Sequence, residues 1–186
     1  VLSSLTGAQY FAVGKDNGFS CGALGLPYSQ NFDSITAPAM PGCWTVQDVN
    51  GDGTKWTTSG TDYNSSPNSL VYSWNTNNAA NDWAFSPGFN LTAGTSYRIS
   101  FKYVVGDATL PEKLKIGIGT TAINTSMTTI ADLGSLTNTT YSTATYDFVP
   151  ATTGVYYVGL NAYSDKDMYY LSIDDFSVSV SPATLL

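Results

Sequence analysis

SYRISFKYVV, residues 96–105, alternates apolar and polar side chains over its whole length. In an extended chain, one side would carry the apolar set and the other the polar set: Tyr97, Ile99, Phe101, Tyr103 and Val105 against Arg98, Ser100 and Lys102. A period of two residues is typical of a strand with one face buried and one in solvent. The stretch therefore predicts an antiparallel strand on a hydrophobic core.

The same texture recurs along the chain. Strands are expected at residues 113–118, 141–149, 155–163 and 170–180, with weaker candidates at 44–47, 55–59, 69–74 and 83–86. Clusters of Gly, Pro, Asn and Asp separate them and mark turns. No segment keeps an apolar period of 3.6 residues, although residues 126–133 could hold one helical turn. Short strands at intervals of roughly 10 residues predict an all-β fold, a two-sheet antiparallel β-sandwich with jelly-roll topology.

The 186 residues fit one domain of the larger all-β kind. We expect residues 1–25 to be a linker or the tail of a preceding module, residues 26–180 to form the jelly-roll domain, and residues 181–186 to be a C-terminal linker. No signal peptide begins the sequence, and no apolar run approaches the roughly 20 residues of a membrane span. The chain is expected to be a mature, monomeric segment of a longer secreted protein, without membrane insertion.

Composition limits the kinds of partner. Only 11% of the residues are charged, against roughly 25% in a typical soluble domain. Ser, Thr, Asn and Gly supply the polarity instead, as in many extracellular β modules. The net charge of −7 repels phosphate backbones and anionic lipid, which disfavours nucleic acid as a partner. Because the chain has no histidine, any metal site should be all oxygen, which selects calcium or magnesium.

Catalytic groups are scarce. Glu112 is the only glutamate, whereas glycoside hydrolysis normally needs two close carboxylates, usually Glu; an Asp pair stays formally possible. A serine hydrolase would lack its histidine, and a cysteine nucleophile would lack its base. Arg98 is the only arginine, which disfavours lyase chemistry. The sequence predicts a protein that is not an enzyme.

Cys21 and Cys43 are the only cysteines, and their spacing fits neither a zinc knuckle nor a redox pair. Two alternatives remain: buried free thiols, or a disulfide that fixes the leading segment to the domain. The extracellular composition favours the disulfide.

DVNGDG, residues 48–53, matches the first half of an EF-hand loop. In such a loop Asp48, Asn50 and Asp52 would converge on one cation, and a glycine at the sixth position permits the turn. The twelfth position is Ser59, so the usual bidentate glutamate is missing. The remaining ligands would have to come from elsewhere in the fold. The alternative is a hairpin turn without a metal, because Asn-Gly and Asp-Gly are common turn dipeptides.

Further acidic residues are natural donors for this site. Asp33 follows an apolar residue, and Asp174 and Asp175 interrupt the last expected strand. A like-charge pair inside a strand is costly unless a cation or solvent compensates it. If the first and last strands pair, both places would close over one calcium ion together with the loop. Alternatively, one acid of the pair is a buried ligand and the other faces solvent.

Six segments together resemble a known family. They are PYSQNFD (27–33), PGCW (41–44), DVNGDG (48–53), NDWAFSP (81–87), AGTSY leading to SFKY (93–103) and IDDF (173–176). Their order and spacing resemble the cleaved-adhesin or choice-of-anchor J domains of secreted Bacteroidetes proteins, which include the adhesin domains of gingipains and are similar to MAM-type jelly rolls. The resemblance spans about residues 26 to 180.

The resemblance implies a calcium-bearing β-sandwich for adhesion or an accessory role, without catalytic activity. By position it implies Asp33, the acids of the 48–53 loop and the 174–175 pair as metal ligands. The family commonly has Glu where Asp33 stands, so the present side chain has a shorter reach.

Aromatic residues offer a second site. Carbohydrate modules stack sugar rings on exposed Trp or Tyr and read hydroxyl groups with amides. YSWNTNN, residues 72–78, places Trp74 beside Asn75 in an amide-rich loop, and we take both as ligand-binding candidates together with Tyr63 and Trp56. The alternative for each ring is core packing, which we expect for Trp44 and Trp83.

We therefore expect a non-catalytic, calcium-stabilised binding or adhesion module, extracellular or on a bacterial cell surface, that recognises a glycan or a host or matrix protein. The alternative is a spacer or protein-docking accessory domain of a larger secreted enzyme, in contact with neighbouring domains of that chain.

Overall fold

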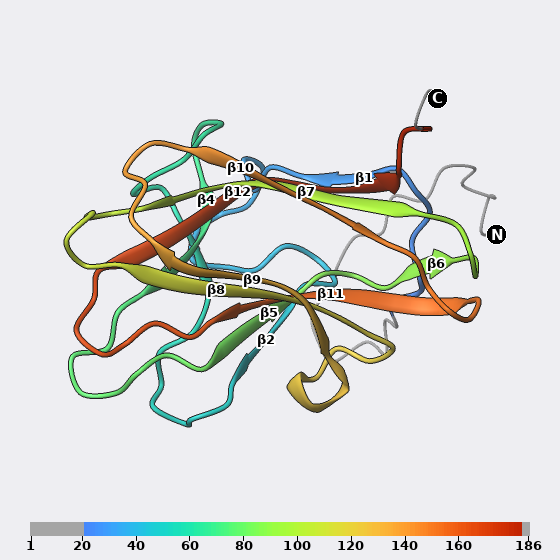
Figure 1. Ribbon diagram of the computed structural model, residues 1–186. Helices are drawn as coiled ribbons and strands as arrows, with labels where there is room; N and C mark the ends of the chain where they lie inside the picture. Colours follow the sequence, from blue (N-terminus) through green and yellow to red (C-terminus); the bar gives the residue numbers. More distant parts are fainter. Residues whose placement is uncertain (1–20, 184–186) are drawn as a thin grey trace, which may run out of the picture.

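Two antiparallel sheets packed face to face make up the computed structural model, which describes residues 21–183 (Figure 1). The first sheet has the order β10-β7-β12-β4-β3, with β1 also paired to β12. Its strands are β1 (Tyr28–Gln30), β3 (Thr57–Ser59), β4 (Ser69–Ser73), β7 (Tyr97–Val105), β10 (Ser142–Phe148) and β12 (Tyr170–Val180). The expected β-sandwich with jelly-roll topology is confirmed.

The second sheet has the order β2-β5-β11-β8-β9, and β6 also pairs with β11. Its strands are β2 (Thr45–Asp48), β5 (Asp82–Phe85), β6 (Phe89–Leu91), β8 (Glu112–Gly119), β9 (Thr128–Leu136) and β11 (Gly154–Ala162). In Figure 1 it forms the lower layer beneath β7, β10 and β12. Within residues 21–183 no helix is long and apolar enough to cross a membrane.

Strand β7 follows the alternation of its sequence. Ile99, Phe101 and Val105 are each 1% exposed and face the core between the sheets. Arg98 and Lys102 lie on the opposite side, where Arg98 forms a bidentate pair with Asp147 of β10. This strand lies between β10 and β12, so it organises the first sheet as the pattern predicts.

Residues 126–133, where a helical turn was considered, form most of β9; that expectation was wrong. The only helical element in the described part of the chain is a 3-10 turn just before it, η2 (Asn124–Ser126). The pairing of β9 with β8 shifts register twice, and Gly134 has a φ of 60°. Such bulges break the strict alternation that identifies strands in a sequence.

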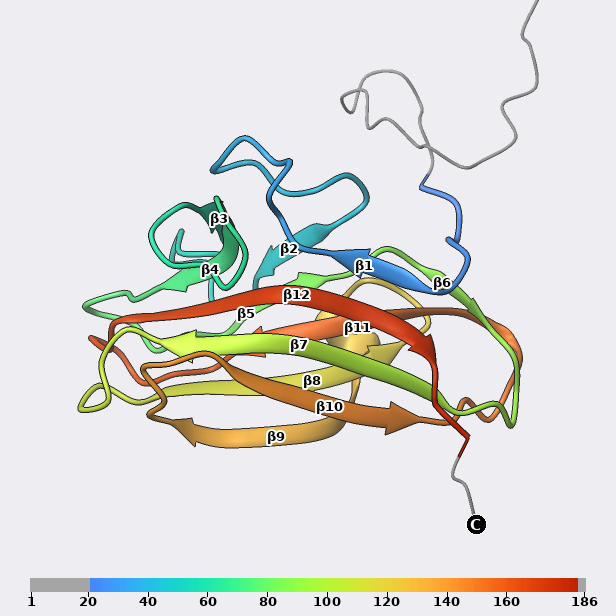
Figure 2. The same cartoon turned by 90° about the horizontal axis from the view of Figure 1, so that it is seen from above.

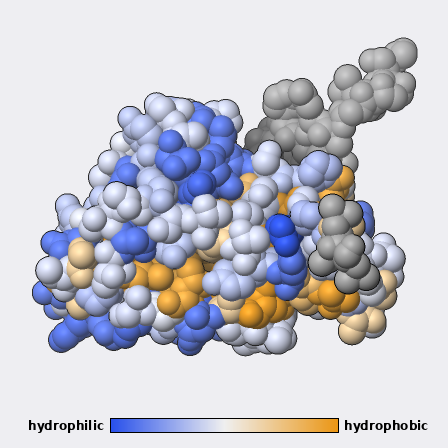
Figure 3. Space-filling view, turned by 45° about the horizontal axis from the view of Figure 1, so that its top comes forward, coloured by the Kyte–Doolittle hydropathy of each residue, from blue (hydrophilic) through white to orange (hydrophobic). Residues whose placement is uncertain are grey.

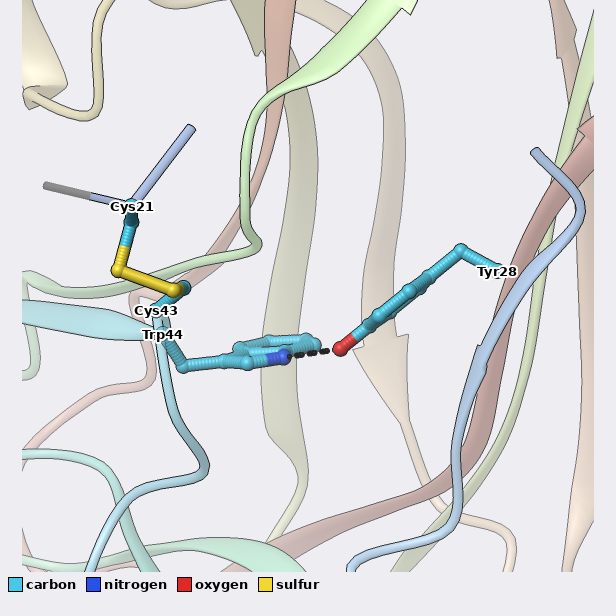
Figure 4. The surroundings of a disulfide bond; sticks show 4 residues. All are labelled: Cys21, Tyr28, Cys43 and Trp44. Carbon is cyan, nitrogen blue, oxygen red and sulfur yellow. Dashed lines mark hydrogen bonds between the residues drawn. A yellow bond between two sulfur atoms is a disulfide. The ribbon is translucent and has the colours of Figure 1, made fainter. Parts of the chain in front are cut away.

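Residues 21–25, expected to be part of a linker, belong to the domain. Leu24 forms a parallel bridge with Phe89, and its amide donates to the carbonyl of Gly88 at 2.7 Å. Cys21 is disulfide-bonded to Cys43, so of the two alternatives the structure has the bond (Figure 4). The linker expected at residues 1–20 lies outside the described residues.

At the C-terminal end, Ser181 also belongs to the domain, because its amide donates to the carbonyl of Ser96. Beside the disulfide, the indole of Trp44 donates to the hydroxyl of Tyr28 at 2.9 Å (Figure 4). Trp44 is 5% exposed and belongs to the core, as expected.

Trp83 is buried in a different place from the other core residues. It lies on the outer face of the second sheet, where its ring is close to Gly117 and Gly159 of neighbouring strands and stacks on Phe85. The segment 120–127 covers this face, and Met127 packs near the same two glycines. The backbone and side chain of Asn124 exchange hydrogen bonds with the side chain of Gln47, which fixes the segment over the sheet.

Candidate functional site

A group of three rings lies where β4 ends and β12 begins; we call it the aromatic platform. Its members are Trp74 and Tyr169, which are exposed, and Tyr170, which is half-buried. It forms because Tyr170 pairs with Ser73 across the two antiparallel strands. The ring centroids of Trp74 and Tyr169 are 5.2 Å apart, and those of Tyr169 and Tyr170 are 4.7 Å apart. Trp74 is 42% exposed and Tyr169 is 39% exposed, although large aromatic side chains are normally buried.

Gly106, just after β7, allows the two tyrosines to lie this close to the backbone. A Cβ atom at this position would fall inside van der Waals distance of both rings. The amide of Gly106 donates to the carbonyl of Tyr170 at 3.0 Å, and the amide of Trp74 donates to that of Tyr169 at 2.9 Å. The platform is therefore attached to the first sheet by backbone hydrogen bonds.

The amide-rich loop beside the platform is ordered by Asn75. The side-chain oxygen of Asn75 accepts from the amides of Asn77 and Asn78 at 2.9 and 3.1 Å, and its nitrogen donates to Thr54. Its backbone carbonyl accepts from the amide of Asp167 at 2.8 Å. Asn75, a predicted ligand residue, thus uses its polar atoms to shape the loop, whereas Asn77 and Asn78 are exposed.

The other predicted aromatic candidates separate clearly. The prediction that Trp56 binds a ligand was wrong, because its side chain is 0% exposed. Its indole donates to the carbonyl of Asp82, and its ring packs on Tyr72 inside the core. Tyr63 is 42% exposed in the loop between β3 and β4. The preceding residue, Asp62, accepts a 3.0 Å hydrogen bond from the hydroxyl of Tyr170, so the loop that carries Tyr63 contacts the platform.

Sequence reasoning missed Tyr169 and Tyr170. The available signal was an aromatic doublet at the start of the last strand. On the face in Figure 3, apolar surface is divided into separate patches by hydrophilic residues.

The residues of the 48–53 loop satisfy one another. Asp48 ends β2, and its carboxylate accepts from the amides of Gly51 at 2.6 Å and Gly53 at 2.8 Å. Both glycines have positive φ, 69° and 87°, as expected where the chain turns. Asn50 donates to Asp52 and to the carbonyl of Ala79. The geometry is that of an Asx-type turn in which the carboxylates accept backbone hydrogen bonds.

Asp82, which sequence reasoning did not select, lies next to this loop. It pairs with Asp48 across β2 and β5 and is fully buried. One carboxylate oxygen accepts from the amide of Asn81, and the other has no hydrogen-bond partner in the described structure. Burial, with the nearby charges of Asp48 and Asp52, raises the pKa of Asp82 to about 6.

The second acidic group lies at a bulge in β12. Asp174 is fully buried, and one of its oxygens accepts from the amides of Asn64 and Ser65 at 2.7 and 2.8 Å. Asp175 accepts from the side chain of Asn64, and Asp33 accepts from the hydroxyl of Ser65. Burial raises the pKa of Asp174, while the three backbone hydrogen bonds to its carboxylate oppose that shift.

The single composite site expected from the sequence is divided in two. Asp48, Asn50 and Asp52 lie with Asp82 beside the second sheet, whereas Asp33, Asp174 and Asp175 lie around the loop that leads into β4. Within residues 21–183 no hydrogen bond joins the two groups, and β2 and β12 belong to different sheets. Figure 2 shows β12 from above, with the segments around β1, β3 and β4 along one of its sides.

Within residues 21–183, no three acidic or cysteine side chains converge in a geometry that would hold a metal ion. The chemistry of the donors still fits a hard cation, because both groups offer carboxylate and amide oxygens only. Two buried atoms near the loop have no hydrogen-bond partner, one oxygen of Asp82 and the hydroxyl of Tyr72. The Asp82 oxygen is therefore free either for a cation or for that hydroxyl. Binding there would require the loop carboxylates to exchange backbone hydrogen bonds for the ion.

Comparison with known proteins places the fold. None of the protein-family models matches the sequence, and neither does any curated protein. Among solved structures, the K1 cleaved adhesin domain of Lys-gingipain from Porphyromonas gingivalis W83 has a TM-score of 0.69 at 18% identity, with 84% of this chain and 99% of that domain covered. The predicted resemblance to cleaved adhesin domains is confirmed at the level of the fold.

Carbohydrate-binding modules share the fold. The CBM22-1 xylan-binding domain of Xyn10C from Paenibacillus barcinonensis has a TM-score of 0.59 at 15% identity, covering 88% of this chain and 99% of that domain. The C-terminal family 22 module of Clostridium thermocellum Xyn10B has a TM-score of 0.60 at 15% identity, covering 86% and 95%. At these identities the similarity is one of fold.

Proposed function

We propose that this chain is a non-catalytic glycan-binding adhesion module, extracellular or on a cell surface, that binds its ligand on the aromatic platform. The observation that carries the proposal is the exposure of the packed rings of Trp74 and Tyr169 beside an amide-bearing loop. An aromatic face supplies apolar contact to the C–H side of a sugar ring, and amide groups reach its hydroxyls. The backbone hydrogen bond from the amide of Trp74 to the carbonyl of Tyr169 holds these two residues side by side before a ligand arrives.

The similar folds support this proposal. One is a xylan-binding domain and another is an adhesin domain. The low proportion of charged residues is also typical of an extracellular module. Fold alone does not assign a function, so the proposal depends on the platform.

We also propose that calcium stabilises the module, as the resemblance implies. The supporting observation is the pair of oxygen-only groups, one around Asp82 and one around Asp174. Each group brings together segments that are far apart in the sequence. An ion in either place would be structural, because neither group includes a residue of the platform.

A glycan array followed by titration calorimetry tests the binding role. We expect Trp74→Ala to weaken binding of any array hit by roughly tenfold or more, since losing about 1.4 kcal/mol of stacking corresponds to that factor. Ile123→Ala is the matched control: Ile123 is 47% exposed on the segment covering the second sheet, away from the platform. Equal loss in both variants, or none in Trp74→Ala, would contradict the platform. Silence across the array would favour a spacer or docking domain of a larger secreted enzyme.

A further inference from the structure

Three aspartates from three different loops lie next to residues of the aromatic platform. Asp62 lies in the loop between β3 and β4 and accepts from the hydroxyl of Tyr170. Asp107 directly follows Gly106, the glycine under both tyrosine rings. Asp167 lies two residues before Tyr169, and its amide donates to the loop of Asn75.

These acids outweigh the bases near them. Lys113 is already paired with Asp165 at 2.7 Å. Lys55 and Lys166 are exposed in neighbouring loops, and Lys166 lies between Asp165 and Asp167. With Asp165 included, four acids and three lysines lie in or beside these loops, which leaves an excess of one negative charge. The other bases of the first sheet are engaged elsewhere, Arg98 with Asp147 and Lys102 with a threonine of β10.

Hydrogen bonds stabilise the charged form of Asp107. Hydrogen bonds from the amide and hydroxyl of Thr109 hold the pKa of Asp107 below its usual range. The faces of the platform rings add the negative end of their quadrupoles. A cation placed over such a face is attracted, more so when carboxylates are close by. An anion placed there meets repulsion from both sources.

Resting on the proposed glycan-binding function, we propose that the platform selects glycans that carry free amino groups over N-acetylated ones, and excludes glycans that carry carboxylates or sulfates. An ammonium group would lie over Trp74 or Tyr169 and near Asp62 and Asp107, while the sugar ring stacks on the neighbouring aromatic face. An N-acetyl group removes the charge but keeps the ring, so its binding would rest on stacking and amide contacts alone.

Calorimetry with three hexamers tests the selectivity: β-1,4-linked glucosamine, β-1,4-linked N-acetylglucosamine and α-1,4-linked galacturonate. The titrations are made at about pH 5.5, above the ordinary pKa of an Asp side chain. In about 0.02 M salt, we expect the glucosamine hexamer to bind roughly tenfold more tightly than the N-acetylated one, and the galacturonate hexamer to bind weakest. In about 0.5 M salt the difference should narrow, because exposed charges are screened.

The net charge of −7 would attract a polycation anywhere on the surface, so the acids must be tested by position. The double variant Asp62→Asn with Asp107→Asn should lower the ratio of the two dissociation constants several-fold. Asp147→Asn is the control: it lies opposite Arg98, eight residues along β7 from Gly106, or about 26 Å at the rise of a strand.

The outcomes separate the two proposals. If the N-acetylated hexamer binds as tightly as the glucosamine hexamer, or Asp147→Asn acts like the double variant, the selectivity is wrong while glycan binding stands. Tighter binding of galacturonate would also overturn it. If no hexamer binds and the array is silent, the glycan-binding function falls and the selectivity falls with it.

Discussion

Glu112 is buried at the start of β8 with only part of its hydrogen-bonding capacity used. One carboxylate oxygen accepts from the amide of Tyr169 at 2.8 Å, which links this acid to the backbone of the platform. The other oxygen has no partner in the described structure. Burial raises the pKa of Glu112, and the hydrogen bond from the amide of Tyr169 opposes that shift. The protein therefore carries a carboxylate whose charged form is disfavoured.

We expect Glu112→Gln to stabilise the protein at pH 7 by about 1 kcal/mol. A carboxyl group whose pKa is raised by folding favours the folded state below its unfolded pKa, and that advantage is lost as pH rises through the raised value. The stability of the wild type relative to the variant should therefore increase as pH falls through the raised pKa of Glu112 toward its ordinary value of 4.5. Urea unfolding of both proteins should show the difference shrinking at the lower pH. A constant difference across that range would contradict the raised pKa.

At the scale of single residues, the sequence distinguished exposed from buried tryptophans only in part. Trp74 is exposed beside an amide-rich loop, as predicted, and Trp44 is in the core. Trp56 lies between a turn and a weak strand, a position that an exposed ring could also occupy. Its indole nevertheless donates to the carbonyl of Asp82 in the other sheet. That contact joins residues 26 positions apart, and no local pattern reports it.

Among the elements, segment 120–127 is unusual because it gives the outer face of the second sheet its own small core. Strands β8 and β11 carry Gly117 and Gly159 opposite one another, and the ring of Trp83 lies over them. A Cβ atom on Gly159 would lie 2.8 Å from the Trp83 ring and 3.1 Å from the sulfur of Met127. The glycines therefore make room for a layer that covers the sheet.

Gly159→Ala should accordingly destabilise the protein by about 1–3 kcal/mol, the usual cost of overpacking. Gly22→Ala is the control, because a Cβ atom there would meet no other atom within 4 Å. Denaturant unfolding of both variants measures the effect. Equal stability of the two would show that the segment does not pack tightly over Trp83.

Strong strands could be predicted, and weak ones only where their alternation survives. Residues 96–105, 155–163 and 170–180 match β7, β11 and β12 closely. Strands β1 and β6 have three residues each, too short for a period to be counted. β9 was missed because its two register shifts hide the alternation. Short length and bulges, rather than composition, set the limit here.

For the whole molecule, the sandwich separates two groups of acids that the sequence analysis combined in one calcium site. Loop 48–53 resembles half an EF-hand, and the acids of β12 appeared to complete it, but strand order assigns them to different sheets. The condition that the first and last strands pair holds, because β1 pairs with β12, and Ser65 contacts both Asp33 and Asp174. The position of β2 beside β5 depends on long-range pairing, so sequence motifs could not predict it.

Calcium, if bound to the folded state alone, should stabilise the module through mass action. At about 100 times its dissociation constant, it would add about 2.7 kcal/mol and raise the melting temperature by roughly 5–10 °C relative to protein in EDTA. Asp52→Asn tests the loop group, and Asp33→Asn tests the group at β12. The variant that loses the calcium-dependent shift identifies the site, whatever its own melting temperature in EDTA. Melting that is unchanged by both EDTA and calcium would show that the carboxylates of the 48–53 loop serve the turn alone, held by backbone amides as the structure describes them.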